Sequence, residues 1–294
     1  MNIWRIHLKA DSEEDIDQRQ LCIDKGIVGV GWQSDFTAVP VPWQEYLDTA
    51  QKKYGDTSWW TALNAMKNRM QPDDLIWTRD YSGNYYLGRI LSDWYYDTSD
   101  ECSRADIVNV RSCEWHKIGT EEAVPGKVVS SFRPPRTVQM IDDDNIYDFS
   151  LFTYNQKCKN NFYQVENLKG QDIYSFLSAE DCEDALAVYL QVNYDYLIIP
   201  SSCKDSTMTY EYELKNRITG KNAVAQVKSG WIPLDCDDYS KLDTDIFLFA
   251  TCGKYNGNPR PNIKTIDPDT MRKFLYEKTV LLPEKMKIWI ELTR

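Results

Sequence analysis

The hydrophobic pattern of this chain changes near its middle, and that change limits the folds that the sequence can adopt. In the second half, an amphipathic helical pattern over residues 178–194 precedes several short apolar strands and a second helix over residues 268–277. Helices that alternate with strands are typical of an α/β domain. The first half instead has helices followed by a run of strands. We therefore expect two hydrophobic cores, because a domain usually contains about 100–200 residues.

The first half predicts a small, strongly bent sheet or β-barrel with helices, of the α+β class. Helices are expected after Ser12 as far as Gly26, and over residues 43–54 and 59–70. The expected strands cover residues 3–8, 27–30, 74–78, 84–91, 107–111 and 113–118.

The second half predicts an α/β core. Its expected strands cover residues 196–199, 208–214, 223–228, 245–250 and 287–292. The stretch between the halves is rich in Asp, Asn and Lys and predicts one helix and a linker. We therefore expect an N-terminal domain over residues 1–140, a connector over residues 141–168 and a C-terminal domain over residues 169–294.

The net charge of −11 initially argues against a nucleic-acid partner, because phosphate groups are bound mainly by Lys and Arg. Residues 1–150 carry 16 basic and 25 acidic side chains, whereas residues 151–294 carry 18 and 20. The acidity therefore lies mostly in the first half, and the second half keeps enough basic residues for a nucleic-acid partner. Two histidines in the whole chain exclude a His-rich metal site.

Several features predict a cytoplasmic protein that does not bind membranes. The chain has no apolar run of the roughly 18–20 residues that span a bilayer. The residues that follow Met1 lack the basic and apolar regions of a signal peptide. Eight cysteines without a CxxC pair indicate reduced thiols.

Two strands of the second half place chemically active side chains at alternating positions. Glu211 and Glu213 share one face of their strand, and Gln226 and Lys228 share one face of theirs. If a turn at Thr219-Gly220 pairs the strands, carboxylate, amide and ammonium groups converge. Such a set suits phosphodiester cleavage, in which oxygen ligands hold Mg²⁺ beside the phosphate and a lysine stabilises developing charge. The same spacing also fits a solvated sheet face with a cross-strand ion pair, so spacing alone leaves both interpretations open.

These residues carry a resemblance to a known family. Cys182-Glu183-Asp184-Ala185, Tyr210-Glu211-Tyr212 and Gln226-Val227-Lys228-Ser229-Gly230 resemble the motifs of PD-(D/E)xK nucleases, in particular the Mrr-like branch, in which Gln replaces an acid. The resemblance covers roughly residues 175–292 and implies a restriction-endonuclease-like core.

Under this resemblance, each motif residue receives a role. Glu183 is the acid on the helix, Glu211 and Gln226 hold Mg²⁺ or Mn²⁺, and Lys228 is the catalytic lysine. The family commonly has Asp where this chain has Glu211, and Glu213 is an additional acid that competes for that position.

The first half is rich in Trp and Tyr, most of which we expect in the core. Its segments 26–32, 73–77 and 85–90 resemble a PUA/EVE-type β-barrel, a fold that binds RNA or modified bases in DNA. We expect Trp32, Trp77 and Tyr81 to contact an unstacked base, because Trp32 ends a strand and Tyr81 lies in a turn beside the strand of Trp77.

Together the two resemblances imply a Mg²⁺-dependent endonuclease that recognises DNA with modified bases and restricts phage genomes. An RNA-directed nuclease, a catalytically silent sensor of nucleic acids or nucleotides, and an acidic interaction protein are the alternatives. Nucleases that cut both strands often act as dimers, and a homodimer is left open.

Overall fold

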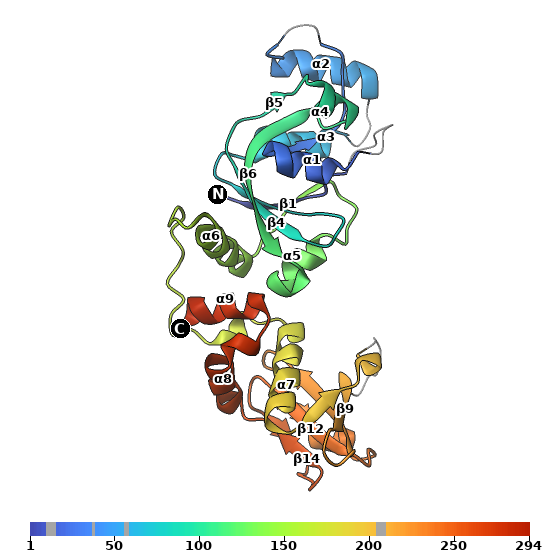
Figure 1. Cartoon of the computed structure of the whole chain (residues 1–294), viewed down its shortest axis with the longest axis vertical. Helices are drawn as coiled ribbons and strands as arrows, with labels where there is room; N and C mark the ends of the chain where they lie inside the picture. Colours follow the sequence, from blue (N-terminus) through green and yellow to red (C-terminus); the bar gives the residue numbers. More distant parts are fainter. Residues whose placement is uncertain (10–15, 37–38, 56–58, 204–209) are drawn as a thin grey trace. The chain divides into compact units, whose positions relative to one another are not determined.

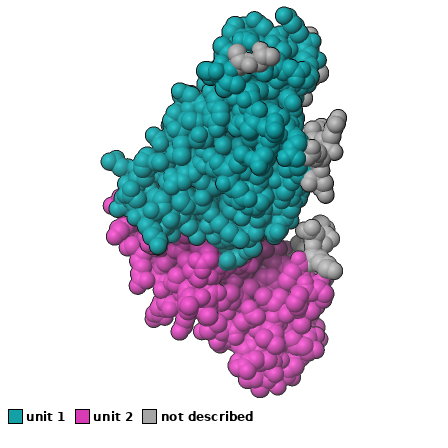
Figure 2. Space-filling model, turned by 45° about the horizontal axis from the view of Figure 1, so that its top comes forward, with its two compact units in different colours: residues 1–166 teal, residues 167–294 magenta. Residues whose placement is uncertain are grey.

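The computed structural model describes residues 1–9, 16–36, 39–55, 59–203 and 210–294. The chain forms two compact units, Met1–Glu166 (unit 1) and Asn167–Arg294 (unit 2), which Figure 2 distinguishes by colour. Both units combine helices with strands. Among the described residues, no helix is long and apolar enough to cross a membrane.

Unit 1 contains a curled sheet with helices on both of its faces (Figure 1). Its strands are β1 (Ile3–Ile6), β2 (Ile27–Val30), β3 (Leu75–Arg79), β4 (Tyr85–Ile90), β5 (Tyr95–Tyr96), β6 (Asn109–Gly119) and β7 (Val138–Met140). Its helices are α1 (Gln18–Lys25), α2 (Trp43–Tyr54), α3 (Trp59–Asn64), which continues as a π-helix over Ala65–Arg69, α4 (Asp100–Arg104), α5 (Gly126–Ser131) and α6 (Asp144–Cys158).

The sheet of unit 1 curls around its longest strand, β6. The strand order is β2-β6-β4-β3-β1-β7, and β5 also pairs with β6. Asn109 to Ser112 of β6 pair with β2, whereas its later residues pair with β4. The prediction of separate strands over residues 107–111 and 113–118 was wrong, because Ser112 pairs with Ile27 and the ladder continues through it. The described strands form an open half-barrel that ends at β2 and β7.

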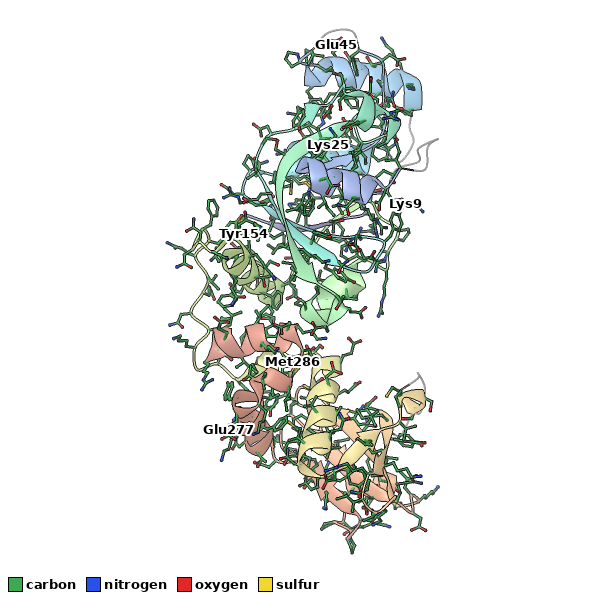
Figure 3. All side chains as sticks on the ribbon, in the orientation of Figure 1. Lys9, Lys25, Glu45, Tyr154, Glu277 and Met286 are labelled. Carbon is green, nitrogen blue, oxygen red and sulfur yellow. The ribbon has the colours of Figure 1, made fainter. Side chains whose placement is uncertain are left out.

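Each face of this sheet has its own core. On one face, Trp4 and Ile76 pack with residues of α1, α2 and α3. On the other face, the Trp77 indole donates a hydrogen bond to Ser150 Oγ of α6 at 3.0 Å. Tyr154 of α6, labelled in Figure 3, donates from its hydroxyl to Glu114 Oε2 at 2.6 Å. The segment expected as a connector, residues 141–168, therefore contains a helix that belongs to unit 1 and packs on its sheet.

Unit 2 is built on a mixed five-stranded sheet with strand order β14-β12-β10-β9-β8. Its strands are β8 (Tyr196–Ile198), β9 (Tyr212–Asn216), β10 (Asn222–Lys228), β12 (Asp245–Ala250) and β14 (Ile263–Thr265), with a separate pair formed by β11 (Leu234–Asp235) and β13 (Tyr255–Asn256). Its helices are α7 (Ala179–Asn193), α8 (Pro268–Glu277) and α9 (Glu284–Thr293).

Pairing directions divide this sheet into a parallel part and an antiparallel part. Strand β12 lies between β10 and β14 and is parallel to both, whereas β9 is antiparallel to β10 and to β8. The predicted strand over residues 208–214 begins outside the described residues. Its described part corresponds to β9, which ends two residues beyond the predicted end. The predicted helices over residues 178–194 and 268–277 correspond to α7 and α8.

The closing segment of unit 2 differs from its prediction. Residues 287–292 were expected to form a strand, but they belong to helix α9. Ile288, Ile290 and Leu292 alternate as in a strand, yet Met286, Trp289 and Ile290 repeat at the spacing of three and four residues that a helix requires. All three are buried, and Trp289 is 1% exposed. Burial of the Trp289 indole favours the helical arrangement.

Helix α9 is attached to α7 by a buried ion pair. Lys285 Nζ lies 2.8 Å from Asp181 Oδ1, and both side chains are less than a tenth exposed. The other oxygen of Asp181 accepts the backbone N–H of Ser178, and the Ser178 hydroxyl accepts the N–H of Asp181. Asp181 thus completes the capping box of α7 and binds α9 at the same time.

We expect Lys285→Ala to lower the free energy of unfolding by about 3 kcal/mol, because it leaves the Asp181 carboxylate buried without its partner. Urea denaturation measures the change. Lys287→Ala is the matched control, since Lys287 pairs with Glu284 on an exposed face of the same helix. Equal losses in the two variants would contradict a special role for the buried pair.

Candidate active site

The hairpin of β9 and β10 brings two of the expected site residues into contact. Tyr212 lies opposite Ala225, and the N–H of Glu211 donates to the Ala225 carbonyl at 2.9 Å, which extends the pairing beyond β9. Glu211 therefore lies beside Gln226 on the neighbouring strand. The side-chain Nε2 of Gln226 donates hydrogen bonds to Glu211 Oε1 and to the Val227 carbonyl.

Burial fixes the position of this amide. Gln226 is 5% exposed, because β10 is an inner strand with β9 on one edge and β12 on the other. Residues of β10 and β12 on the same face, Val224 and Leu248, belong to an apolar cluster that also contains Tyr239. The carbonyl oxygen of the Gln226 amide takes no part in the two hydrogen bonds of its Nε2.

The structure separates the competing acid Glu213 from this contact. Glu213 lies opposite Val224, is exposed, and accepts a hydrogen bond from the Tyr210 hydroxyl at 2.9 Å. The strand alternation expected from the sequence thus holds, but Glu211 is the acid that meets Gln226.

Glu183 approaches the same end of the sheet from helix α7. The Tyr212 hydroxyl donates to the Glu183 backbone carbonyl at 3.2 Å, which holds this turn of α7 against β9. Burial and then the negative charge of Glu211 raise the pKa of the Glu183 carboxyl, which Lys228 opposes, and the resulting pKa is about 7. Glu211 and Lys228 are therefore both close enough to act electrostatically on Glu183.

Lys228 ends strand β10 with an exposed side chain. Its backbone carbonyl accepts the N–H of Thr251 at 3.0 Å, which fixes the main chain at this position. Within the described ranges, no carboxylate lies at ion-pair distance from its ammonium group. The ammonium group is thus available to an anion that approaches from solvent.

The chemistry of these donors suits a hard divalent cation. Glu211 and Glu183 supply carboxylate oxygens and Gln226 supplies an amide oxygen, and Mg²⁺ and Mn²⁺ prefer oxygen ligands. The Glu211 carboxylate contributes to the raised pKa of Glu183 because the two negative charges repel each other. A bound cation would relieve that repulsion. No group of three or more His, Cys, Asp or Glu side chains forms a metal cluster in the part of the chain that the structure describes. The site therefore has two acids and an amide rather than a three-acid cage.

The three aromatic residues expected to contact a base do not gather in one place. Trp77 is fully buried, and its hydrogen bond to Ser150 places it in the core. Trp32 is half-buried and has a positive φ of 68°, and its carbonyl accepts the Tyr46 hydroxyl. Tyr81 is 62% exposed, with the Arg19 guanidinium 4.0 Å from its ring centre. Trp77 is consequently unable to stack on a base in this fold.

An exposed aromatic residue beside Lys228 was missed by the sequence interpretation. Trp231 is 86% exposed and Ile232 is 59% exposed. Their loop is held in place, since the Gly230 carbonyl accepts from Thr251 Oγ1 at 3.2 Å. Because Gly230 and Pro233 flank the pair, turn chemistry was the available signal for a surface loop.

Comparisons with known proteins give limited information. Residues 4–131 match the model of a family described as a domain of unknown function, DUF8426, which is less than half of the chain. No curated protein matches the chain. Among solved structures, the chain is similar to the DNA modification-dependent restriction endonuclease AspBHI, with 11% identity over 92% of this chain and 80% of that one. The TM-score is 0.24, which does not establish a common fold.

We expect Glu183→Gln to stabilise the metal-free protein at pH 8 by on the order of 2 kcal/mol and to have little effect near pH 4. A carboxyl whose pKa is raised by folding, here to about 7, favours the folded state when protonated. The stability that it contributes is present at low pH and is lost as the pH rises from the unfolded-state pKa through about 7.

Urea denaturation of both proteins across this pH range, with a chelator present, measures the effect. Glu180→Gln is the control, because Glu180 is an exposed acid in the first turn of the same helix. A Glu183→Gln variant whose stability advantage does not grow with pH would contradict the raised pKa.

Proposed function

We propose that the protein is a metal-dependent endonuclease that cuts DNA, and that unit 1 directs it to DNA with modified bases in defence against phage. The contact between Glu211 and Gln226 on adjacent strands, with Glu183 and Lys228 within electrostatic reach, is the observation that carries the proposal. The order of helix α7, hairpin β9–β10 and parallel strand β12 supports a nuclease core of the PD-(D/E)xK type.

Each residue of the site has a definite task under this proposal. Glu211 and Gln226 would hold Mg²⁺ or Mn²⁺, with Glu183 as the second acid. The bound cation would supply activation of water and neutralisation of phosphate charge. Gln226 orients the Glu211 carboxylate through its hydrogen bond. Lys228, whose side chain is exposed at the end of β10, contacts the phosphate and stabilises the negative charge that develops on it.

Unit 1 is the part that would recognise the substrate. The resemblance of its segments 26–32, 73–77 and 85–90 to PUA/EVE domains supports a base-reading role, and its half-barrel sheet is compatible with it. Of the three aromatic residues expected to contact a base, Trp32 and Tyr81 keep exposed surface for such a contact. The localisation that suits this function is the cytoplasm.

We expect Lys228→Ala to lower the rate of DNA cleavage at least 100-fold, because the lysine stabilises charge that develops in the transition state. The assay incubates plasmid DNA, with and without cytosine modification, with the protein and Mg²⁺ or Mn²⁺. Lys215→Ala is the matched control, since Lys215 is an exposed lysine of the same hairpin. Failure of the wild-type protein to cut any substrate, or equal rates for Lys228→Ala and wild type, would overturn the catalytic proposal.

A catalytically silent nucleic-acid sensor is the second candidate function. The specific observation in its favour is that only two acids and one amide meet in the described part of the site. Such a protein would bind nucleic acid without cutting it. It would also bind divalent cations weakly or not at all.

Metal binding distinguishes the two functions. We expect Mn²⁺ to bind the wild-type protein in calorimetric titration, and Glu211→Gln to weaken that binding at least tenfold, because it removes a charged oxygen ligand. Glu213→Gln is the control and should bind as the wild type does, since Glu213 faces Val224. No heat with the wild type, together with retained DNA binding, would favour the sensor; equal losses in both variants would contradict the assignment of Glu211.

A further inference from the structure

Arginine side chains converge at one end of the sheet in unit 1. Arg5 lies in β1, Arg79 ends β3, and Arg136 lies just before β7. The guanidinium carbons of Arg5 and Arg79 are 5.5 and 5.3 Å from the centre of the Phe132 ring. Arg5 also donates to the backbone carbonyl of Arg136 and, at 2.9 Å, to Gln139 Oε1. The Phe132 ring therefore brings Arg5 and Arg79 together, and the hydrogen bond from Arg5 to the main chain of Arg136 joins the third arginine to them.

These arginines lack acidic partners. Among the described residues, no carboxylate lies at ion-pair distance from Arg5, Arg79 or Arg136. Other arginines of this unit do have such partners: Arg89 lies 3.5 Å from Glu114. The contrast is notable because residues 1–150 carry a net charge of −9. In an acidic unit, the described residues thus give these positive charges no ion-pair partner.

The electrostatic effect of this arrangement is visible in neighbouring groups. Burial, followed by the charges of Arg136 and Arg79, lowers the pKa of Arg5 to about 10. Burial and then Arg5 lower the pKa of His7, and Arg79 and Arg19 act in the same direction. Like charges that repel in this way destabilise the unliganded fold, and a bound anion would relieve the repulsion.

Buried polar atoms also point to a missing partner. Arg5 is fully buried, and its Nε has no hydrogen-bond partner within the described ranges. Burial raises the pKa of Tyr85, a side-chain hydrogen bond with Arg79 opposes that rise, and the exposed Glu121 adds to it, but no effect of Glu121 on Arg5 or His7 is resolved. Among the described residues, Glu121 thus lies within electrostatic reach of Tyr85, but no acid lies at ion-pair distance from the cluster.

The geometry of the guanidinium groups indicates the class of the anion. Arginine binds phosphate oxygens with two parallel N–H donors, which makes it the preferred residue for phosphate recognition. Arg136 and its neighbour Arg133 are exposed, and Arg79 is half-buried. The cluster therefore extends from the edge of the core to the surface, as a contact with a polymer backbone requires.

We propose that Arg79 and Arg136 form a phosphate-binding site of unit 1 that contacts the phosphodiester backbone of a nucleic acid. The buried Arg5 supports this site from the side of the core. The site lies in unit 1, whereas the proposed cleavage residues lie in unit 2. Binding through it does not depend on metal or on cleavage, so it is tested separately from the nuclease proposal.

The test measures the affinity of the full chain for a fluorescent duplex DNA at several salt concentrations, by anisotropy, with EDTA to prevent cleavage. Each phosphate contact contributes about one unit to the slope of log K against log salt. We expect Arg79→Gln and Arg136→Gln each to reduce that slope by about one and to weaken binding roughly fivefold to tenfold near 0.1 M salt. Arg79→Lys, which keeps the charge but loses the paired donors, should lie between wild type and Arg79→Gln.

Arg69→Gln is the matched control. Arg69 belongs to the same unit and its removal changes the net charge equally, but it packs over Trp4 on the other face of the sheet. Its slope should equal that of the wild type. Slopes that are unchanged in Arg79→Gln and Arg136→Gln, or that fall equally in Arg69→Gln, would overturn the proposal. Thermal unfolding of every variant verifies that it remains folded.

A second measurement distinguishes a nucleic-acid backbone from a small phosphate ligand. Pyrophosphate, compared with chloride at equal ionic strength, should compete with DNA for the wild type and have less effect on Arg79→Gln. If pyrophosphate raises the unfolding temperature of the wild type while the arginine variants bind DNA normally, the site takes a small phosphate compound and the backbone proposal is wrong.

Discussion

The pairing of β10 on both of its edges is the constraint on which unit 2 depends. Hydrogen bonds to β9 on one edge and to β12 on the other leave this strand no freedom to slip, because a shift of one residue would move every side chain to the opposite face. Gln226 is consequently held at 5% exposure, and its amide meets Glu211 across the hairpin. The position of each candidate catalytic group follows from this register.

Unit 1 shows two ways of burying an arginine. Arg111 is 1% exposed, and backbone carbonyls accept hydrogen bonds from its guanidinium, among them Met70 at 2.8 Å. Arg5 is equally buried, but two other arginines lie nearby and its Nε is left without a described partner. In the first arrangement, the fold itself supplies the hydrogen-bond acceptors of the buried guanidinium group. Under the proposed phosphate site, a bound anion would offset the like charges of the second arrangement.

Local signals in the sequence predicted the elements that they control directly. Ser178 and Asp181 indicate the start of α7, because a capping box needs only residues three positions apart. Pro268 similarly marks the first turn of α8. The hairpin that carries the candidate site was predicted from alternation and from the turn at Gly220, whose φ is +72°. These features depend on neighbours in the chain and require no knowledge of the fold.

Features that depend on distant contacts were not predictable in this way. The alternation of Ile288 and Ile290 favoured a strand, and only the burial of Trp289 against Phe176 in unit 2 selects the helix. Trp77 was expected at a binding surface, whereas α6 covers it and Ser150 accepts its N–H. Whether Glu211 or Glu213 meets Gln226 depends on the register between two strands, which an alternating pattern alone leaves open.

The ion pair of Asp181 and Lys285 joins residues that are synthesised far apart in time. The capping box of α7 needs only residues of its own first turn, but the Asp181 carboxylate can receive its cation only after α9 has been synthesised. Until then, the helix that carries Glu183 lacks the contact that anchors its first turn. The residues of the candidate site are therefore all synthesised before the contact that fixes the helix of Glu183 can form.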